Sequence, residues 1–268
     1  QDKKPQGERF SRGTGLTDTH LHLHFPQYDA DRAAVIERAL AEGFRYFLNI
    51  GTGLDDSRKA IAVAEQYPRV YAALGYHPHE TKAANPSDLA ELAKLLKHPK
   101  VVAIGEVGLD FFHDHSPREV QEQIFRTFLD WYRESGKPLI LHCRDAYDPL
   151  LGILKETASP YRGVLHCFSS NAATMKKFVD LGFHIAFGGA LTYKKNDGLR
   201  EACRACPPER LLLETDAPYL APQSRRGERN EPLYMVETAE CAAGLHGMGL
   251  EAMAERTTLN AVNLFGLC

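Results

Sequence analysis

The chain has 268 residues, of which 44% are hydrophobic and 25% charged, a balance typical of a globular protein with a sizeable core. Its formal net charge of -3 excludes a globally basic surface, so a nucleic-acid partner would have to be held by a local patch or by a metal. No run approaches the roughly 20 apolar residues of a membrane-spanning helix, so we expect no membrane partner.

After a polar N-terminal tail, residues 1–14, short apolar runs alternate with helical stretches. The expected strands cover residues 16–22, 45–50, 70–74, 100–105, 138–141, 163–165, 184–187 and 210–213. The expected helices cover residues 31–42, 55–67, 86–97, 117–135, 147–156, 172–181, 198–206, 233–245, 250–255 and 258–265. Strands that alternate with helices in this way pair in parallel. This rhythm predicts an α/β fold, a single (β/α)8 TIM barrel that forms one hydrolase domain over residues 15–268.

Six cysteines are scattered along the chain, unlike the dense cysteines of a small disulfide scaffold. We therefore expect reduced thiols. The first residues also lack the apolar stretch of a secretory signal peptide. These features predict a cytoplasmic protein, a monomer or a weak oligomer with no obligate protein partner.

Ligand-type side chains stand at the carboxyl ends of five predicted strands. They are His20 and His22 on the first strand, Glu106 on the fourth, His142 on the fifth, His166 on the sixth and Asp216 on the eighth. The active site of such a barrel lies at this end, so we expect the six side chains to converge. Four imidazoles and two carboxylates exceed what one transition metal takes when water must also bind. They predict two divalent ions per subunit, Mg²⁺, Mn²⁺ or Zn²⁺, with Glu106 as the bridging carboxylate.

Further polar groups share the predicted faces of these strands. Asp18 and Glu214 lie one layer below the ligands of their strands. We interpret Asp18 as barrel filling or as support for the ligands, and Glu214 as a supporting or a structural group. Arg144 has the same parity as His142 and is expected to bind an anionic substrate, the alternative being a surface salt bridge.

Substrate contacts are predicted from two other stretches. His77 and His79 end the third predicted strand, and we expect them to contact the substrate or to support the ligands. Residues 224–232 form the one dense cationic cluster of the sequence and directly follow the eighth predicted strand. Arg226 and Arg229 of this loop are predicted to bind phosphate, the alternative being an ordinary solvated loop. The histidines interpreted as solvated or buried in the core are His98, His113, His115, His184 and His246.

Seven short motifs follow one another along the chain. They are Asp18-Thr-His-Leu-His22, Gly75-Tyr-His-Pro-His79, Gly105-Glu-Val-Gly-Leu-Asp110, Leu141-His-Cys-Arg144, His166-Cys-Phe-Ser169, Glu214-Thr-Asp-Ala-Pro-Tyr219 and Arg226-Gly-Glu-Arg-Asn-Glu-Pro232. Together they resemble the TatD family of metal-dependent deoxyribonucleases, over about residues 16–267. The resemblance implies an amidohydrolase-like barrel, a two-metal centre held by the same six residues and, in some members, 3′→5′ trimming of single-stranded DNA. The tail before Gly15 and residues 192–196 depart from the family pattern.

The expected reaction is two-metal hydrolysis of a phosphodiester, with Asp216 as the general base and Glu106 between the ions. The predicted function is a deoxyribonuclease, a 3′–5′ exonuclease whose partner is DNA with single-stranded or 3′ ends. One alternative is an esterase or amidohydrolase that acts on aminoacyl-tRNA or a small ester or lactone, because fold does not fix substrate. A noncatalytic metal-binding scaffold is the remaining alternative.

Overall fold

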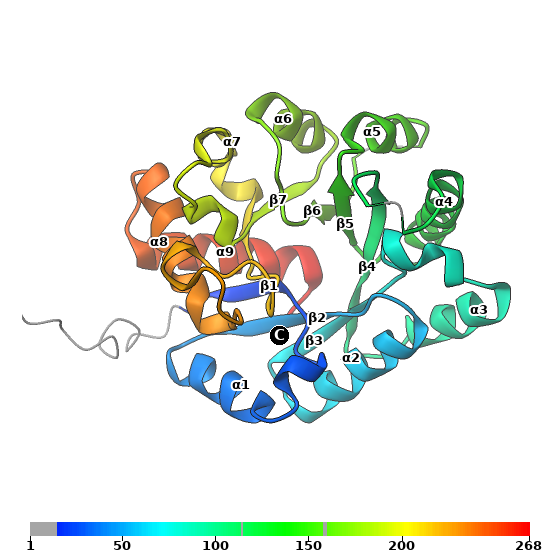
Figure 1. Ribbon diagram of the computed structural model, residues 1–268, viewed down its shortest axis with the longest axis horizontal. Helices are drawn as coiled ribbons and strands as arrows, with labels where there is room; N and C mark the ends of the chain where they lie inside the picture. The colour runs from blue at the N-terminus through cyan, green and yellow to red at the C-terminus, as the bar shows by residue number, and fades with distance from the viewer. Residues whose placement is uncertain (1–14, 114, 158–159) are drawn as a thin grey trace, which may run out of the picture.

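The computed structural model describes residues 15–113, 115–157 and 160–268, so the predicted tail over residues 1–14 lies outside the described part. Within that part, eight parallel strands follow one another around a barrel in the order of the sequence (Figure 1). The strands are β1 Thr17–Leu21, β2 Tyr46–Ile50, β3 Val70–Leu74, β4 Val101–Asp110, β5 Leu139–Arg144, β6 Gly163–Leu165, β7 His184–Phe187 and β8 Leu211–Leu213. The predicted (β/α)8 barrel is confirmed.

Helices follow the strands and cover the outside of the barrel (Figure 1). They are α1 Arg32–Ala41, α2 Leu54–Gln66, α3 Pro86–Leu95, α4 Arg118–Ser135, α5 Tyr147–Lys155, α6 Ala172–Asp180, α7 Asp197–Ala205, α8 Met235–Leu245 and α9 Leu250–Phe265. Asparagine side chains cap two of them, Asn85 at α3 and Asn171 at α6, by accepting a backbone hydrogen bond from the first turn. Among the described residues, no helix combines the length and the apolar character needed to cross a membrane.

The seam between β8 and β1 closes the barrel at the level of the predicted ligands. A single bridge pairs Leu21 with Ala217, and His22 N donates a hydrogen bond of 2.8 Å to Ala217 O. Asp216 N donates another of 2.8 Å to His20 O. The first and last strands therefore meet through the backbone of residues that carry predicted ligands.

Small and branched apolar side chains fill the barrel interior. Those at most 1% exposed include Leu48, Ala73, Ala103, Ile140, Val164, Ala186 and Leu212. Phe265 of α9 and the following Leu267 pack onto this cluster. Asn260 of the same helix donates hydrogen bonds of 2.8 Å to Pro208 O and Leu211 O, at the start of β8. Helix α9 thus closes the amino end of the barrel, and the carboxyl ends of the strands form the opposite face.

Strands β4 and β5 extend beyond the ends predicted for them, to Asp110 and Arg144, which pair with each other. Gly108 makes this pairing possible. Its φ is +143°, and a Cβ here would lie 2.0 Å from His142 O, so the position requires glycine. Glu106 and His142 consequently lie inside strands, whereas the sequence predicts them at strand ends.

The last helix also differs from the prediction. Helix α9 is continuous, whereas the sequence predicts two helices separated at residues 256–257. The hydroxyl of Thr257 donates a hydrogen bond of 2.9 Å to Met253 O one turn earlier, so this polar side chain is satisfied within the helix. The helix can therefore continue through a position that looks like a break in the sequence.

Candidate metal centre

Strand β1 supplies two imidazoles, His20 and His22, at the carboxyl end of the barrel. His20 is fully buried, and its Nδ1 makes no hydrogen bond within the described residues, whereas its Nε2 faces the carboxylates of Glu106 and Asp216. A buried polar atom without a partner costs about 1–3 kcal/mol. Coordination of a cation would satisfy this imidazole, because a neutral ring offers a lone pair to a metal.

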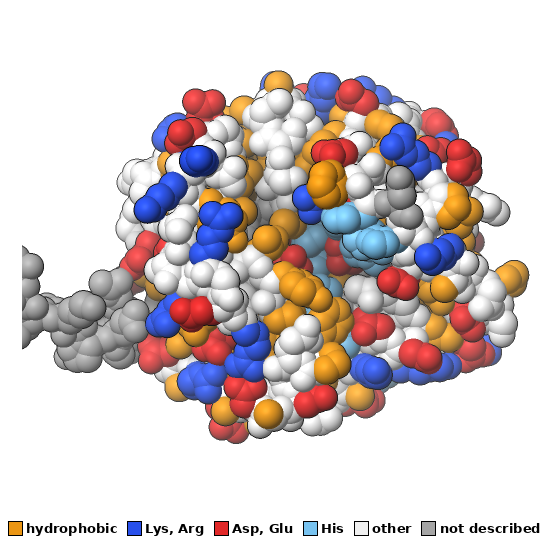
Figure 2. Space-filling view, viewed as in Figure 1, with side chains coloured by type: hydrophobic (Ala, Val, Ile, Leu, Met, Phe, Trp, Pro, Cys, Tyr) orange, Lys and Arg blue, Asp and Glu red, His pale blue; other side chains and the backbone are white. Residues whose placement is uncertain are grey.

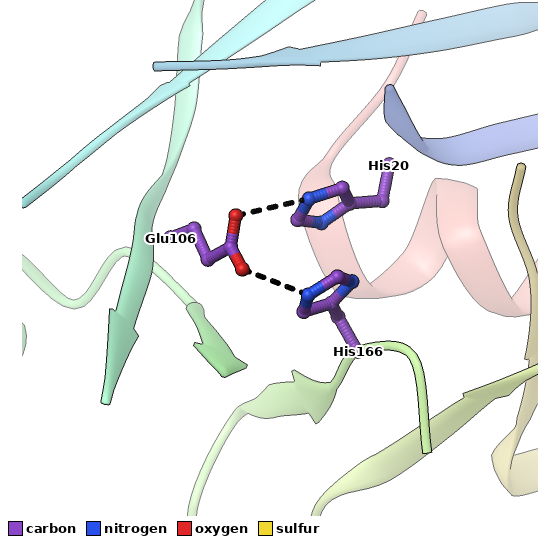
Figure 3. Close-up of side chains that lie close together, drawn as sticks. All are labelled: His20, Glu106 and His166. Carbon is purple, nitrogen blue, oxygen red and sulfur yellow. Dashed lines mark ion pairs between the residues drawn. The ribbon is translucent and has the colours of Figure 1, made fainter. Parts of the chain in front are cut away.

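Glu106 of β4 lies between imidazoles from two sides of the barrel, with one carboxylate oxygen toward each (Figure 3). Its Oε2 is 3.2 Å from His20 Nε2. Its Oε1 is 2.8 Å from His166 Nε2 and 2.8 Å from His142 Nδ1. A carboxylate whose two oxygens face different donors has the geometry needed to bridge two ions.

Asp216 completes the donors on the β1 side. Its Oδ1 lies 3.4 Å from His22 Nε2 and 3.7 Å from His20 Nε2. Its φ of 58° is in the left-handed region, which aspartate tolerates better than most residues. Three overlapping groups each offer ligand atoms within 4.8 Å of one another: His20, His22 and Asp216; His20, Glu106 and His166; and His77, Glu106 and His142. These imidazoles and carboxylates could hold divalent cations.

Three imidazoles are fixed by a partner on their other ring nitrogen. The pairs are His22 Nδ1 with Ile50 O at 2.8 Å, His166 Nδ1 with Glu214 Oε1 at 3.2 Å, and His142 Nε2 with Asp110 Oδ2 at 3.0 Å. Such a partner fixes the tautomer and leaves the lone pair of the second nitrogen for a metal, as in most metal-binding histidines. Glu214, predicted as a supporting group, is one of these partners.

The charges of the centre depend on one another. Burial would raise the pKa of Glu106, but His166 and the other imidazoles outweigh it and hold that pKa well below its usual value. Burial also opposes the shift at Asp216, whose pKa is lowered by His22 and neighbouring imidazoles. At His166 burial would lower the pKa, and Glu106 raises it well above the usual value. A cation that binds His166 must displace its proton, so metal binding should become tighter as the pH rises.

Asp18 and Thr215 fix the seam beneath these ligands. Asp18 is fully buried, and its Oδ1 accepts hydrogen bonds of 3.0 Å from Thr215 N and 3.2 Å from His20 N. The Thr215 hydroxyl binds the other oxygen of Asp18, and burial raises the pKa of this carboxyl to about 8. The network ties β1 to the residue before Asp216 and so fixes the spacing between ligands from the first and last strands.

His77 and His79 lie on the β4 and β5 side of the centre. His77 Nε2 is 3.4 Å from Glu106 Oε1, and burial lowers the pKa of His77 to about 4, so the ring is neutral near pH 7. His79 Nε2 is 2.8 Å from Asp110 Oδ2. His77 thus contacts a ligand directly, whereas His79 contacts a supporting carboxylate. In the space-filling view, histidine side chains gather beside a hollow near the middle of this face (Figure 2).

Arg144 and Arg226 are each placed against an aromatic ring. The guanidinium carbon of Arg144, at the end of β5, lies 4.1 Å from the centroid of Phe112. That of Arg226 lies 4.4 Å from the centroid of Tyr193. Both arginines are exposed, so each cation is held on a ring but open to solvent.

Arg229 has a different position from the one predicted. Its two terminal nitrogens donate hydrogen bonds of 2.8 Å to both carboxylate oxygens of Asp31, next to α1. Its guanidinium also lies over the ring of Tyr28. This bidentate pair uses the hydrogen bonds that a phosphate would need. Arg229 therefore anchors the loop to the start of α1, through a partner 198 positions away that the local sequence does not reveal.

Asp110 is a residue of this site to which the sequence analysis gave no role. It ends β4, is 1% exposed and contacts both His142 and His79 through Oδ2. A usable signal was its place four residues after Glu106, on the same face of an extended strand. His113, interpreted as solvated or buried in the core, also lies 3.3 Å from Asp110 Oδ2 through its Nδ1.

The comparison with known proteins agrees with this geometry. A family model described as TatD related DNase matches residues 17–266. The chain belongs to the TatD family. YabD of Bacillus subtilis, an uncharacterized metal-dependent hydrolase, is 41% identical over 251 residues, which are 93% of this chain and 98% of YabD. The 3′-5′ ssDNA/RNA exonuclease TatD of Klebsiella pneumoniae is 36% identical over 258 residues, 94% of this chain and 98% of that protein.

A solved TatD-family structure has the same fold. The crystal structure of YJJV, a TatD homolog from Escherichia coli K12, matches with a TM-score of 0.88 and 32% identity. The match covers 94% of this chain and 98% of that one. Together these matches place the chain among the metal-dependent hydrolases of the TatD family.

Proposed function

We propose that this TatD-family hydrolase uses two divalent ions to cleave phosphodiester bonds of DNA, as a 3′–5′ exonuclease on single-stranded ends. The observation that carries the proposal is Glu106, whose two oxygens face separate donors at 3.2 Å and 2.8 Å. Support for the substrate comes from relatives in Klebsiella pneumoniae and Salmonella typhimurium that are named 3′-5′ ssDNA/RNA exonucleases.

The six predicted ligands divide into two sets in this proposal, and we call them together the inner centre. His20, His22 and Asp216 would hold the first ion, His142 and His166 would hold the second, and Glu106, whose oxygens face both sets, would be shared between them. Divalent ions held there, Mg²⁺, Mn²⁺ or Zn²⁺, supply Lewis acidity that lowers the pKa of water and neutralises charge on phosphoryl oxygens.

The residues of the chain then have separate tasks. Asp216 is ionised at neutral pH, because its pKa is lowered despite burial, and so it can accept a proton from the attacking water. Arg144 and Arg226, both exposed, are placed to bind phosphates of the strand. His77 is neutral and 3.4 Å from Glu106, where it can donate a hydrogen bond to a phosphoryl oxygen. Arg229 stays bound to Asp31.

The test is digestion of single-stranded DNA labelled at its 3′ or its 5′ end, with Mg²⁺, Mn²⁺ or Zn²⁺. Asp216→Asn and Glu106→Gln should each lower kcat/KM by about 10²-fold or more, because each removes a group of the reaction. Glu156→Gln is the matched control, since Glu156 is an exposed carboxylate paired with Arg126. Unchanged rates in both variants of the inner centre would contradict the mechanism.

A substrate panel separates this function from its alternatives. Hydrolysis of aminoacyl-tRNA or a lactone, with no cleavage of DNA, would replace the nuclease by an esterase of the same chemistry. For a nuclease, Arg226→Ala should raise KM for DNA and leave hydrolysis of a small neutral ester unchanged. Bound metal with no turnover on any of these substrates would instead favour a noncatalytic scaffold.

A further inference from the structure

A second group of metal-type ligands stands beside the inner centre. It consists of His79, Asp110 and His113, and we call it the outer cluster. Asp110 Oδ2 is 2.8 Å from His79 Nε2 and 3.3 Å from His113 Nδ1. The three residues offer ligand atoms that all lie within 4.8 Å of one another.

The backbone holds the carboxylate of the outer cluster in place. Asp110 Oδ1 accepts hydrogen bonds from Phe112 N at 3.1 Å and His113 N at 2.9 Å. The Asp110 backbone N–H donates to Gln121 Oε1 at 2.8 Å. With Oδ1 occupied, Oδ2 is left facing the imidazoles. A fixed carboxylate of this kind costs little further ordering when an ion binds.

The imidazoles of the outer cluster converge on one carboxylate oxygen. Three imidazole nitrogens, from His79, His113 and His142, lie within 3.3 Å of the single oxygen Asp110 Oδ2. Without a cation, each imidazole can donate a hydrogen bond to this oxygen. A cation would take the place of those protons and bind the same carboxylate oxygen and the lone pairs of the same nitrogens.

Exposure also fits a site that exchanges ions with solvent. The side chains of His79 and His113 are 26% and 34% exposed, whereas that of Asp110 is 1% exposed. The ligands thus combine a buried anion with imidazoles that border water, which leaves an entry path. A further imidazole, His115, lies beside the cluster, with its ring centroid 4.6 Å from that of His79.

We propose that His79, Asp110 and His113 form an additional metal site, which takes a divalent ion that favours imidazole nitrogen, Zn²⁺ above all. His142 lies between this site and the inner centre, with Nε2 3.0 Å from Asp110 and Nδ1 2.8 Å from Glu106. The outer ion is therefore separated from the inner centre by one imidazole. The site does not depend on the proposed DNA substrate.

Zinc content after equilibrium dialysis at low micromolar free Zn²⁺ tests the outer cluster. Wild-type protein should retain about one equivalent of Zn²⁺ more than His113→Ala, because the variant lacks one of three ligands. His113→Cys should recover the lost zinc, since a thiolate is a strong zinc ligand. His98→Ala, which removes a surface imidazole paired with Glu65, is the matched control and should keep the wild-type content.

The Glu106→Gln background separates the two sites. This change weakens the inner centre, yet introducing His113→Ala into it should still remove about one equivalent of Zn²⁺. Equal zinc in Glu106→Gln with and without His113→Ala, with unchanged circular dichroism, would overturn the outer site. Failure of DNA cleavage with the zinc difference intact would overturn only the nuclease proposal.

Discussion

At the residue scale, burial favours the neutral form of histidine at both ends of the barrel, and the neighbouring charges decide the direction in which the pKa moves. In the inner centre, Glu106 outweighs burial and keeps the pKa of His166 high, so a cation that binds this ring would have to replace its proton. At the amino end of β7, His184 has its Nδ1 buried without a hydrogen bond among the described residues. Burial, assisted by the charge of Arg210, lowers the pKa of His184 to about 4. The same residue type is a predicted metal ligand at one end and an acid-sensitive, partly buried group at the other.

This difference predicts how His184 affects stability in acid. The unfolded chain protonates this imidazole below about pH 6.5, whereas the folded chain does so only below about pH 4. Folding stability should therefore fall as the pH drops from about 6.5 to about 4, by about 3 kcal/mol from this residue. Urea unfolding across that range should show a smaller loss for His184→Gln than for wild type. Parallel curves of unfolding free energy against pH for the two proteins would contradict the low pKa of His184.

The six ligands of the inner centre could be proposed from single residues because each follows an apolar run at a strand end. The residues that contact these predicted site residues could not be proposed in the same way. Asp110 lies beyond the predicted end of β4, since nothing local shows that Gly108 lets the strand continue. Arg229 looked like a phosphate ligand because its partner Asp31 lies at the other end of the chain. Charge and periodicity identify candidates, and distant contacts decide their roles.

At the element scale, the barrel depends on how its first and last strands are joined. Strand β8 has three residues, and beyond it a single bridge connects the chain to β1. Helix α9 reinforces this seam, because Thr258 donates a hydrogen bond of 2.9 Å to Gly15 O while Asn260 holds the start of β8. The alternation of eight strands with helices was visible in the sequence. The hydrogen bonds of α9 were not, because they join side chains near the end of the chain to backbone atoms far away in the sequence.

Asn260→Ala should therefore loosen the seam from the amino end. Two carbonyls lose their donor, so the free energy of unfolding should fall by about 1–3 kcal/mol. Asn263→Ala is the matched control, because Asn263 is exposed on the same helix. Denaturant unfolding measures the difference, and kcat at low temperature should stay near wild type because the inner centre lies at the opposite end. Equal stability of the two variants would show that the hydrogen bonds of Asn260 are not needed.

At the scale of the whole molecule, ions in the inner centre would crosslink five strands. The ligands belong to β1, β4 and β5 and to the segments that follow β6 and β8. An ion that binds only the folded chain stabilises it by about 2.7 kcal/mol when the free ion concentration is one hundred times Kd. Ions bound there would thus also stabilise the fold.

Removal of metal should consequently lower the melting temperature. For a chain of this size, we expect EDTA to lower Tm by roughly 5–10 °C, and dialysis against Mn²⁺ or Zn²⁺ to restore it. Differential scanning calorimetry measures the shift. Glu106→Gln should show a clearly smaller response to EDTA, because its inner centre binds ions weakly. The same Tm with and without chelator in the wild type would contradict this coupling.

The closing of the seam also governs when the protein can acquire metal during its synthesis. The ribosome makes His20 and His22 early, but Asp216 emerges almost at the end, and the Asp18 network that fixes their spacing spans 197 positions. A nascent chain presents only part of the predicted donor set, so we expect it to bind ions more weakly than the folded protein does. Metal loading is then expected to follow synthesis, and a chain that stalls before β8 would lack Asp216.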